Sequence, residues 1–341
     1  MRFIVELEPP YSLDYSMSPS FVSSLYVKVK PGEWIKIAGL GGGSLKFRQV
    51  APDKVMVEYI SDAPKAEVEE QAMLELGAWH PPFEDFIHQL PSELRWAAES
   101  LSRIYPGVRL PIAPHDFNYV FISVSLSRRT SYERFVLKWC RRIWQRYNGN
   151  LEAIASASPL ELREVGSSYQ VAQLKVMVSD LLSIPSRLKE LSPDLNIPPL
   201  TSHLDLLKLK PEEARLMLLR ACRYLGPKAA DSLILSCFKA PHFIPCDVHL
   251  KTLTARLGLT DPSTKMPEKS LCSRYVCRKD LIVGVKGCPK VNACLRSKLM
   301  ELRGLGGWFQ TLCYIHGSSI CKTLAPRCDL CDLRHDCPSK P

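Results

Sequence analysis

Residues 219–231 read LRACRYLGPKAAD and decide the fold class of this 341-residue chain. The pattern predicts an amphipathic helix, a tight turn containing glycine and a second helix opened by proline, together spanning about residues 213–238. Such a hairpin directs backbone N–H groups and the positive end of a helix at a phosphate, and its carbonyl groups can hold a cation. Many helix pairs turn at glycine, so a purely structural turn is the alternative.

A candidate catalytic carboxylate follows this hairpin in the sequence. Residues 243–250 read FIPCDVHL, which places Asp247 19 residues after Lys228. Asp247 also has the position of an ordinary N-cap, and the two roles are compatible because backbone N–H groups hold a capping carboxylate ionised. Lys228 lies at a helix start, where the helix dipole and burial lower the pKa of an amine. The pair therefore indicates an amine nucleophile beside a carboxylate that can stabilise positive charge.

Four cysteines near the C-terminus form the most specific motif. Their spacing is C-x6-C-x2-C-x5-C, and the last is followed by Pro338; they are Cys321, Cys328, Cys331 and Cys337. Four thiolates within 17 residues can surround one ion or cluster, and soft sulfur suits iron–sulfur or zinc. Two disulfides or a zinc knuckle are the alternatives.

A second set of four cysteines lies within an insertion of about residues 260–298. Its spacing is C-x4-C-x10-C-x5-C, over Cys272, Cys277, Cys288 and Cys294. This spacing allows a small metal site, but disulfides or free thiols are favoured. Thirteen cysteines are many for a chain in a reducing compartment, where clustered cysteines favour metal ligation over disulfides.

Composition is that of an ordinary globular protein, with 46% hydrophobic and 23% charged residues. The net charge of +10 favours a polyanionic partner, either nucleic acid or an anionic membrane face. The N-terminus has no secretory hydrophobic region, and no run approaches the roughly 18 apolar residues of a membrane span. We expect an intracellular monomer without membrane association.

Hydrophobic periodicity predicts a mostly α protein with a small N-terminal antiparallel sheet. The first 60 residues alternate apolar and polar positions, including 3–7, 24–29 and 54–60. Helical periodicity begins near residue 65 and dominates after residue 107. The expected helices lie near 114–126, 130–147, 151–157, 159–164, 168–185, 199–206, 211–222, 227–238 and 247–257.

The segment from Lys228 to Asp247 resembles the corresponding segment of the eukaryotic-type 8-oxoguanine DNA glycosylases, members of the helix-hairpin-helix (HhH-GPD) DNA glycosylase superfamily. Residues 105–110 and 307–314 are also similar to this group, and the terminal cysteine spacing resembles the [4Fe–4S] loop of endonuclease III and MutY. The resemblance implies a β-rich domain over 1–105, a two-lobed helical core over 106–320 and a cluster loop over 321–341.

The resemblance also implies an activity: base excision from damaged double-stranded DNA, with abasic-site lyase activity. Lys228 attacks C1′ of the flipped nucleotide and Asp247 stabilises the developing positive charge. In the base pocket, Gln310 reads the edge of the base and Tyr314 contacts its face. His249 lies beside the catalytic pair in this interpretation, or is a packed histidine at a helix start.

This sequence departs from the family at three places. The DNA-binding hairpin turn is Tyr224, Leu225 and Gly226, with Tyr224 where the family has its first glycine. Ser232 stands where the family has a base-stacking cysteine.

The third departure concerns the asparagine-rich turn with which the family fills the space that the flipped base leaves in DNA. In this sequence residues 126–129 replace that turn. Arg128 or Arg129 could fill that space, or form a solvated charge pair. The alternatives for the whole protein are an endonuclease III-like enzyme for oxidised pyrimidines and a non-catalytic HhH DNA-binding protein.

Overall fold

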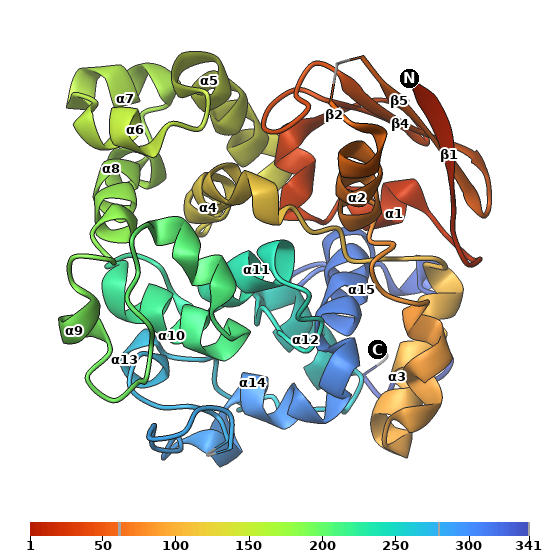
Figure 1. Cartoon of the computed structure of the whole chain (residues 1–341). Coiled ribbons are helices and arrows are strands. Elements are labelled where there is room, and N and C mark those ends of the chain that lie inside the picture. The colour runs from red at the N-terminus through yellow and green to blue at the C-terminus, as the bar shows by residue number, and fades with distance from the viewer. Residues whose placement is uncertain (61–62, 279, 340–341) are drawn as a thin grey trace.

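The computed structural model describes residues 1–60, 63–278 and 280–339. The protein is mostly helical, with a five-stranded antiparallel sheet at its N-terminus (Figure 1), as the sequence predicts. The sheet and α2 lie at one corner of the molecule, α5 to α8 at a second, and the helices from α10 onward fill the opposite side. Within the described ranges, no helix has the length and apolar character that crossing a membrane requires.

The sheet has the strand order β1-β5-β4-β3-β2, and every neighbouring pair is antiparallel. Alternate residues of β5 are buried, which is the pattern of a strand with one face on the core. The strands are β1 (Arg2–Glu6), β2 (Tyr26–Lys30), β3 (Glu33–Lys36), β4 (Leu45–Ala51) and β5 (Lys54–Tyr59).

The helices follow the predicted periodicity closely between residues 114 and 257. The longer ones are α2 (Lys65–Glu75), α3 (Ser92–Ile104), α4 (Phe117–Leu126), α5 (Leu137–Tyr147), α6 (Leu151–Ser156), α7 (Pro159–Val165), α8 (Tyr169–Leu182), α10 (Pro211–Ala221), α11 (Pro227–Cys237), α12 (Val248–Arg256) and α15 (Gly306–Ser319). The short ones are α1 (Leu13–Met17), α9 (Leu188–Leu191), α13 (Lys269–Cys272) and α14 (Leu295–Lys298).

Two expectations about local structure are wrong in detail. The predicted strand at 24–29 begins as a 3-10 helix, η1 (Phe21–Leu25), because the Ser20 side chain accepts from Val22 N and caps a helical turn. The predicted helix at 199–206 is a 3-10 helix over His203–Lys208. There the Ser202 hydroxyl accepts from Leu204 N at 3.2 Å, and Asp205 accepts from the backbone of Thr201 and Ser202, so the helical turn begins only at residue 203.

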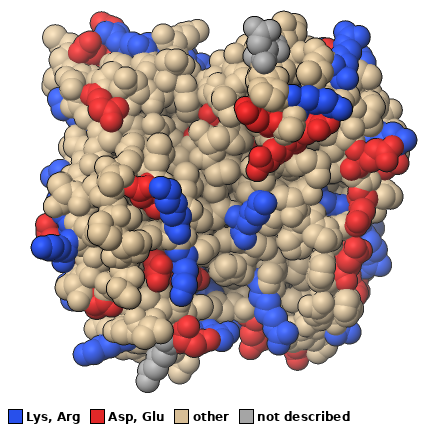
Figure 2. Space-filling view, in the orientation of Figure 1, with Lys and Arg blue, Asp and Glu red and all other residues tan. Residues whose placement is uncertain are grey.

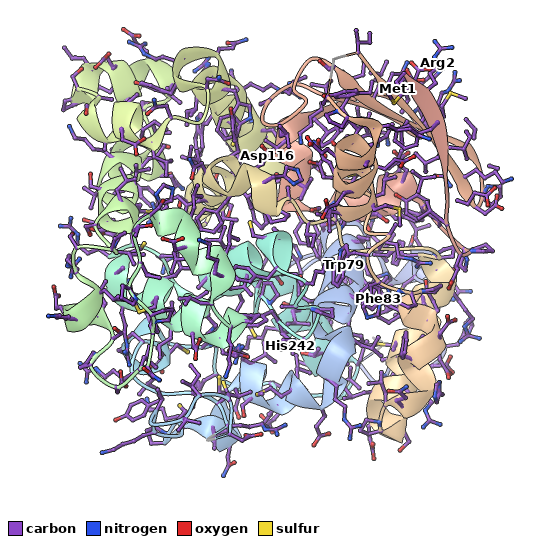
Figure 3. The ribbon with its side chains drawn as sticks, in the orientation of Figure 1. Met1, Arg2, Trp79, Phe83, Asp116 and His242 are labelled. Atoms are coloured by element: carbon purple, nitrogen blue, oxygen red, sulfur yellow. The ribbon has the colours of Figure 1, made fainter. Side chains whose placement is uncertain are left out.

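A buried charge cluster joins the sheet to the helical core. Lys36 of β3 is fully buried, and its Nζ donates to Asp116 Oδ2 at 2.6 Å and to Glu75. Asp116 lies where the start of α4 meets the N-terminal part of the chain (Figure 3). His115 Nε2 lies 2.6 Å from Glu75 Oε1. Burial alone raises the pKa of Glu75, but Lys36 and His115 outweigh it and lower that pKa to about 2. The Lys36 ammonium thus balances two carboxylates from α2 and the start of α4.

Charges of both signs cover the face of the molecule in Figure 2. Acidic side chains gather there over the N-terminal sheet, α2 and α3, while basic side chains are scattered among uncharged ones. That face is therefore no uniform basic surface, although the chain carries a net charge of +10.

Candidate active site

A cleft of about 1570 Å³ contains most of the residues that the sequence singles out. Its walls come from η1, the loop between α4 and α5, the hairpin of α10 and α11, the start of α12 and the middle of α15. The predicted site residues that line it are Arg128, Arg129, Tyr224, Gly226, Lys228, Ser232, Asp247, His249, Gln310 and Tyr314.

The hairpin has the predicted helix-turn-helix form. Gly226 caps α11 with extended backbone, and Pro227 occupies the first helical turn. A Cβ added at Gly226 meets no atom within 4 Å, so the backbone of the turn is open to close approach. Leu225 is buried and anchors the turn in the core, whereas Tyr224 is exposed. The helix therefore presents free N–H groups at an accessible end, which is a suitable arrangement for a phosphate.

Lys228 is partly exposed to the cleft from the first turn of α11. Desolvation lowers its pKa, and the negative charge of Asp247 opposes that shift. The Lys228 Nζ also lies 4.8 Å from the ring centroid of Phe21, which belongs to η1 at the N-terminal end of the chain. The predicted direction of the pKa shift is confirmed, and a larger fraction of Lys228 is free amine at neutral pH than for an exposed lysine.

Asp247 caps α12, as the sequence predicts. One carboxylate oxygen, Oδ1, accepts from Leu250 N at 2.8 Å. The other, Oδ2, accepts from Gln310 Nε2 at 3.1 Å. Both oxygens therefore accept a hydrogen bond, and the two donors fix the orientation of the carboxylate in the cleft.

Two glycines let α15 approach the segment that carries Asp247. A Cβ at Gly307 would lie 2.4 Å from Leu235 Cδ1 and 3.1 Å from Phe243 O. A Cβ at Gly317 would lie 2.8 Å from His249 Cβ. Only glycine permits this separation between the helices, and the close packing brings Gln310 within reach of Asp247.

Tyr314 lies one turn beyond Gln310 on α15. Its ring packs edge to face against the ring of His249, with the two ring centroids 5.3 Å apart. Burial, with a smaller contribution from the charges of Glu133 and Asp247, raises the pKa of Tyr314 to about 12. The phenol is therefore neutral at physiological pH. Ser232 is buried at the cleft wall one turn after Lys228.

The two arginines of the α4–α5 loop have different environments. Arg128 is held by the hairpin and α8, because its Nη1 donates to Gln173 Oε1 at 2.9 Å and its guanidinium lies over the rings of Tyr169 and Tyr224. Arg129 has a positive φ of 51°, an uncommon conformation for a residue with a side chain. Arg128 is therefore a structural link to the hairpin, and Arg129 occupies the tip of the loop at the cleft.

A lysine that the sequence did not single out covers the hairpin carbonyl groups. Lys269, the first residue of α13, donates from Nζ to Arg223 O at 2.7 Å and to Cys222 O. The sequence predicts that such carbonyls can hold a cation, and here an ammonium from the insertion occupies that position. Neither Lys269 nor Phe21 carries a motif, because each reaches the site from a distant part of the chain.

The C-terminal loop brings its four cysteines together at the ends of α12 and α15. Arg256 Nη1 donates to Cys321 Sγ at 3.2 Å, and His316 Nε2 lies 3.5 Å from Cys331 Sγ. Burial raises the pKa of Cys331, and the other three cysteines of the set add to that shift. All thirteen cysteines lie in the described part of the chain, and none of them is paired there in a disulfide.

Comparison with known proteins finds no matching protein-family model and no matching curated protein. The structure is nevertheless similar to solved structures along nearly its whole length. MBOgg1 bound to a low-affinity DNA ligand is 14% identical with a TM-score of 0.63, over 94% of this chain and 96% of that one.

Two further solved structures agree with this match. The 8-oxoguanine glycosylase/lyase of Clostridium acetobutylicum, bound to DNA with cytosine opposite 8-oxoG, is 15% identical with a TM-score of 0.61, over 92% and 94% of the chains. The 3-methyladenine DNA glycosylase of Archaeoglobus fulgidus is 16% identical with a TM-score of 0.59, over 93% of this chain and 100% of that one. This chain has the fold of the helix-hairpin-helix DNA glycosylases.

Proposed function

We propose that this protein is a base-excision DNA glycosylase with abasic-site lyase activity, acting on damaged double-stranded DNA. The observation that carries the proposal is the position of Lys228 and Asp247 at two helix starts in one cleft, with desolvation lowering the lysine pKa. In this proposal residues 1–105 form the β-rich domain, 106–320 the catalytic core and 321–341 the cluster loop.

The reaction begins when a damaged base leaves the duplex and enters the cleft. The free amine of Lys228 forms a bond to C1′ while the bond from C1′ to the base breaks, and the base leaves with the electron pair and takes up a proton. Asp247 stabilises the positive charge that develops on the sugar. Opening of the sugar ring then gives a Schiff base between Lys228 and C1′. Loss of the C2′ proton and of the 3′ phosphate cuts the strand, and water releases the lysine.

The hairpin supports DNA binding in this proposal. The free N–H groups at the start of α11 receive a backbone phosphate beside the extracted nucleotide. Arg129, at the tip of the α4–α5 loop, fills the space that the flipped base leaves.

We propose 8-oxoguanine as the substrate. Gln310 offers a donor and an acceptor to the edge of a purine, and Tyr314, one turn along the same helix, offers an aromatic face. Ser232 and His249 complete the pocket wall. Because the Gln310 amide nitrogen faces Asp247, its Oε1 is the atom left to accept a hydrogen bond from the base.

Cys321, Cys328, Cys331 and Cys337 fit a [4Fe–4S] cluster. All four donors are soft sulfur, and Arg256 and His316 direct nitrogen atoms at two of the sulfurs. The phenol of Tyr105 lies 3.0 Å from His316 Nδ1, and a hydroxyl donating there leaves the imidazole hydrogen on Nε2, facing Cys331. The cluster would be structural, holding the C-terminal loop and its basic residues near DNA.

A panel of duplexes, each carrying one lesion, tests the proposal on denaturing gels. Release of 8-oxoguanine and cleavage of the strand are expected. Cleavage at thymine glycol with no action on 8-oxoguanine would contradict the purine assignment and favour an oxidised-pyrimidine enzyme. Retarded but intact DNA for every lesion would contradict glycosylase activity altogether.

A further inference from the structure

The insertion before α15 folds so that its four cysteines lie in one region. Cys272 ends α13, and Val276 forms a parallel bridge with Gly287, in which Cys288 N donates to Val276 O at 2.8 Å. This bridge sets Cys277 beside Cys288. The backbone then turns through a single 3-10 helix, η6 (Val291–Ala293), and returns with Cys294.

The side chains are also near one another. Cys277 and Cys288 are electrostatic neighbours of Cys294, and Cys277 is also a neighbour of Cys272. All four cysteines are partly exposed, and none forms a disulfide.

Two buried arginines face this group. Arg296, 3% exposed, donates from Nη1 to Cys277 Sγ at 3.0 Å. Arg215, 5% exposed, is the second buried arginine near Cys272. The Nη2 atom of Arg215 is buried and has no hydrogen-bond partner among the residues that the structure describes. Glu212 and Asp231 pair with the two guanidinium groups, so the arginines bring hydrogen-bond donors to the cysteines and no unbalanced charge.

We propose that Cys272, Cys277, Cys288 and Cys294 hold a second metal centre, an iron–sulfur cluster separate from the one at the C-terminus. The inference does not depend on the proposed activity, but the iron count expected below rests on the C-terminal cluster of the proposed function. It revises the sequence-based preference for free thiols or disulfides, because the fold brings the four cysteines near one another and beside two buried arginines.

The sulfur positions favour a cluster over zinc. A tetrahedral zinc ion holds its thiolates about 3.8 Å from one another, since each Zn–S bond is about 2.3 Å. In the described part of the chain, no three cysteine sulfurs of either set all lie within 4.8 Å of one another. A four-iron cluster is larger than a single ion and separates its ligands further. Both cysteine sets also contain a C-x5-C pair and an arginine that donates to a sulfur.

This centre would connect the insertion to the hairpin. Arg215 and Arg296 both face Asp231, which is fully buried on α11 three residues after Lys228. Cys272 and Lys269 are the two ends of α13, and Lys269 covers the hairpin carbonyls. A cluster ligated by Cys272 would therefore fix α13, and with it the ammonium that closes the hairpin.

The test is the metal content of the full chain purified without oxygen. About eight irons and eight sulfides per chain are expected, twice the content of one four-iron cluster. The double variant Cys277→Ser/Cys288→Ser should retain about half the iron, as should Cys328→Ser. Cys140→Ala, a buried cysteine on α5 outside both sets, should leave the iron content unchanged.

A second measurement keeps the proposal testable if the double variant does not fold. In the wild-type protein, Cys277 and Cys288 should resist alkylation until the iron is removed by a chelator, as mass spectrometry of peptides would detect. Four irons with one zinc per chain would overturn the cluster assignment. Four irons, no zinc and immediate alkylation of Cys277 and Cys288 would overturn the metal centre.

Discussion

Gln310 Nε2 donates to Asp247 Oδ2 at 3.1 Å, so the residue expected to read the base is bound to the residue expected to stabilise the sugar. The orientation of the Gln310 amide follows from chemistry, because an ionised carboxylate accepts hydrogen bonds and donates none. Under the proposed function, base recognition and charge stabilisation would share one hydrogen bond, and a base that fits Gln310 would leave Asp247 in position beside Lys228.

Gln310→Ala should reduce kcat/KM for excision of 8-oxoguanine up to about tenfold, since a hydrogen bond to the neutral base is worth about 0.5–1.5 kcal/mol. Cleavage of a preformed abasic site should change much less, because no base is present to be read. Gln145→Ala, an exposed glutamine on α5, is the control. Equal losses on both substrates would mean that Gln310 only supports Asp247.

The reactivity of Lys228 should depend on pH in a defined direction. Desolvation lowers its pKa from 10.5, so borohydride trapping on abasic DNA should rise with pH and reach its midpoint below 10.5. Asp247 raises the same pKa, so Asp247→Asn should move the midpoint lower still while reducing base excision about a hundredfold or more.

Lys228→Gln is the control for this titration. It should abolish trapping and leave duplex binding in place. Undiminished trapping by that variant would remove Lys228 from the mechanism, and a midpoint that rises in Asp247→Asn would contradict the charge interaction between the two residues.

Lys36→Met should strongly destabilise the protein. It removes the cation that balances Glu75 and Asp116 in a fully buried position, a change that typically costs about 3–5 kcal/mol in the free energy of unfolding. Lys65→Met, which breaks the exposed pair with Glu69, should cost about 0.5 kcal/mol or less. Denaturant unfolding of both variants measures the difference, and equal losses would contradict the role of the buried cluster.

The same cluster gives a pH dependence of stability. The pKa of Glu75 in the folded protein, about 2, lies below its usual value of 4.5. Its contribution is therefore fully present above about pH 4.5 and is lost as the pH falls toward 2. Wild-type protein should lose more stability across this range than Lys36→Met, in which only His115 is left to lower that pKa.

The C-terminal cysteines give a prediction of their own. Purified protein should be brown, and Cys328→Ser should lose the C-terminal cluster together with the local fold of residues 321–337, because the binding energy of the cluster is folding energy there. Visible absorbance and limited proteolysis measure the two effects. Colourless protein with stoichiometric zinc would contradict the cluster.

The local sequence was sufficient to predict part of this site. Gly226-Pro227 starts α11 and Asp247 caps α12 through contacts with residues nearby in the chain, so propensity and capping rules identify both. Phe21 against Lys228, and Lys36 against Asp116, join residues far apart in sequence, and no local pattern encodes such pairs. The arginine pair was ambiguous for the same reason, because only the contacts of Arg128 with Tyr169 of α8 and Tyr224 of the hairpin distinguish it from Arg129.

Because Lys269 covers the hairpin carbonyls, DNA binding by the wild-type protein should not depend on which salt cation is in solution. Its ammonium donates to Arg223 O and Cys222 O, and those carbonyls could otherwise hold a metal ion from solution. Lys269→Ala should bind duplex DNA about tenfold more weakly in tetramethylammonium salt, a loss of about 1.4 kcal/mol, because that ion is too large to be held by the two carbonyls. Sodium or potassium at the same ionic strength should restore its affinity.

Wild-type protein should bind DNA equally well in all three salts, since its carbonyls already have a donor. Lys265→Ala, which removes an exposed positive charge from the same insertion, controls for the general loss of attraction to phosphate. A uniform loss of affinity in every salt for Lys269→Ala would indicate a simple charge effect. A loss confined to tetramethylammonium would identify Lys269 as a built-in replacement for the cation of the hairpin.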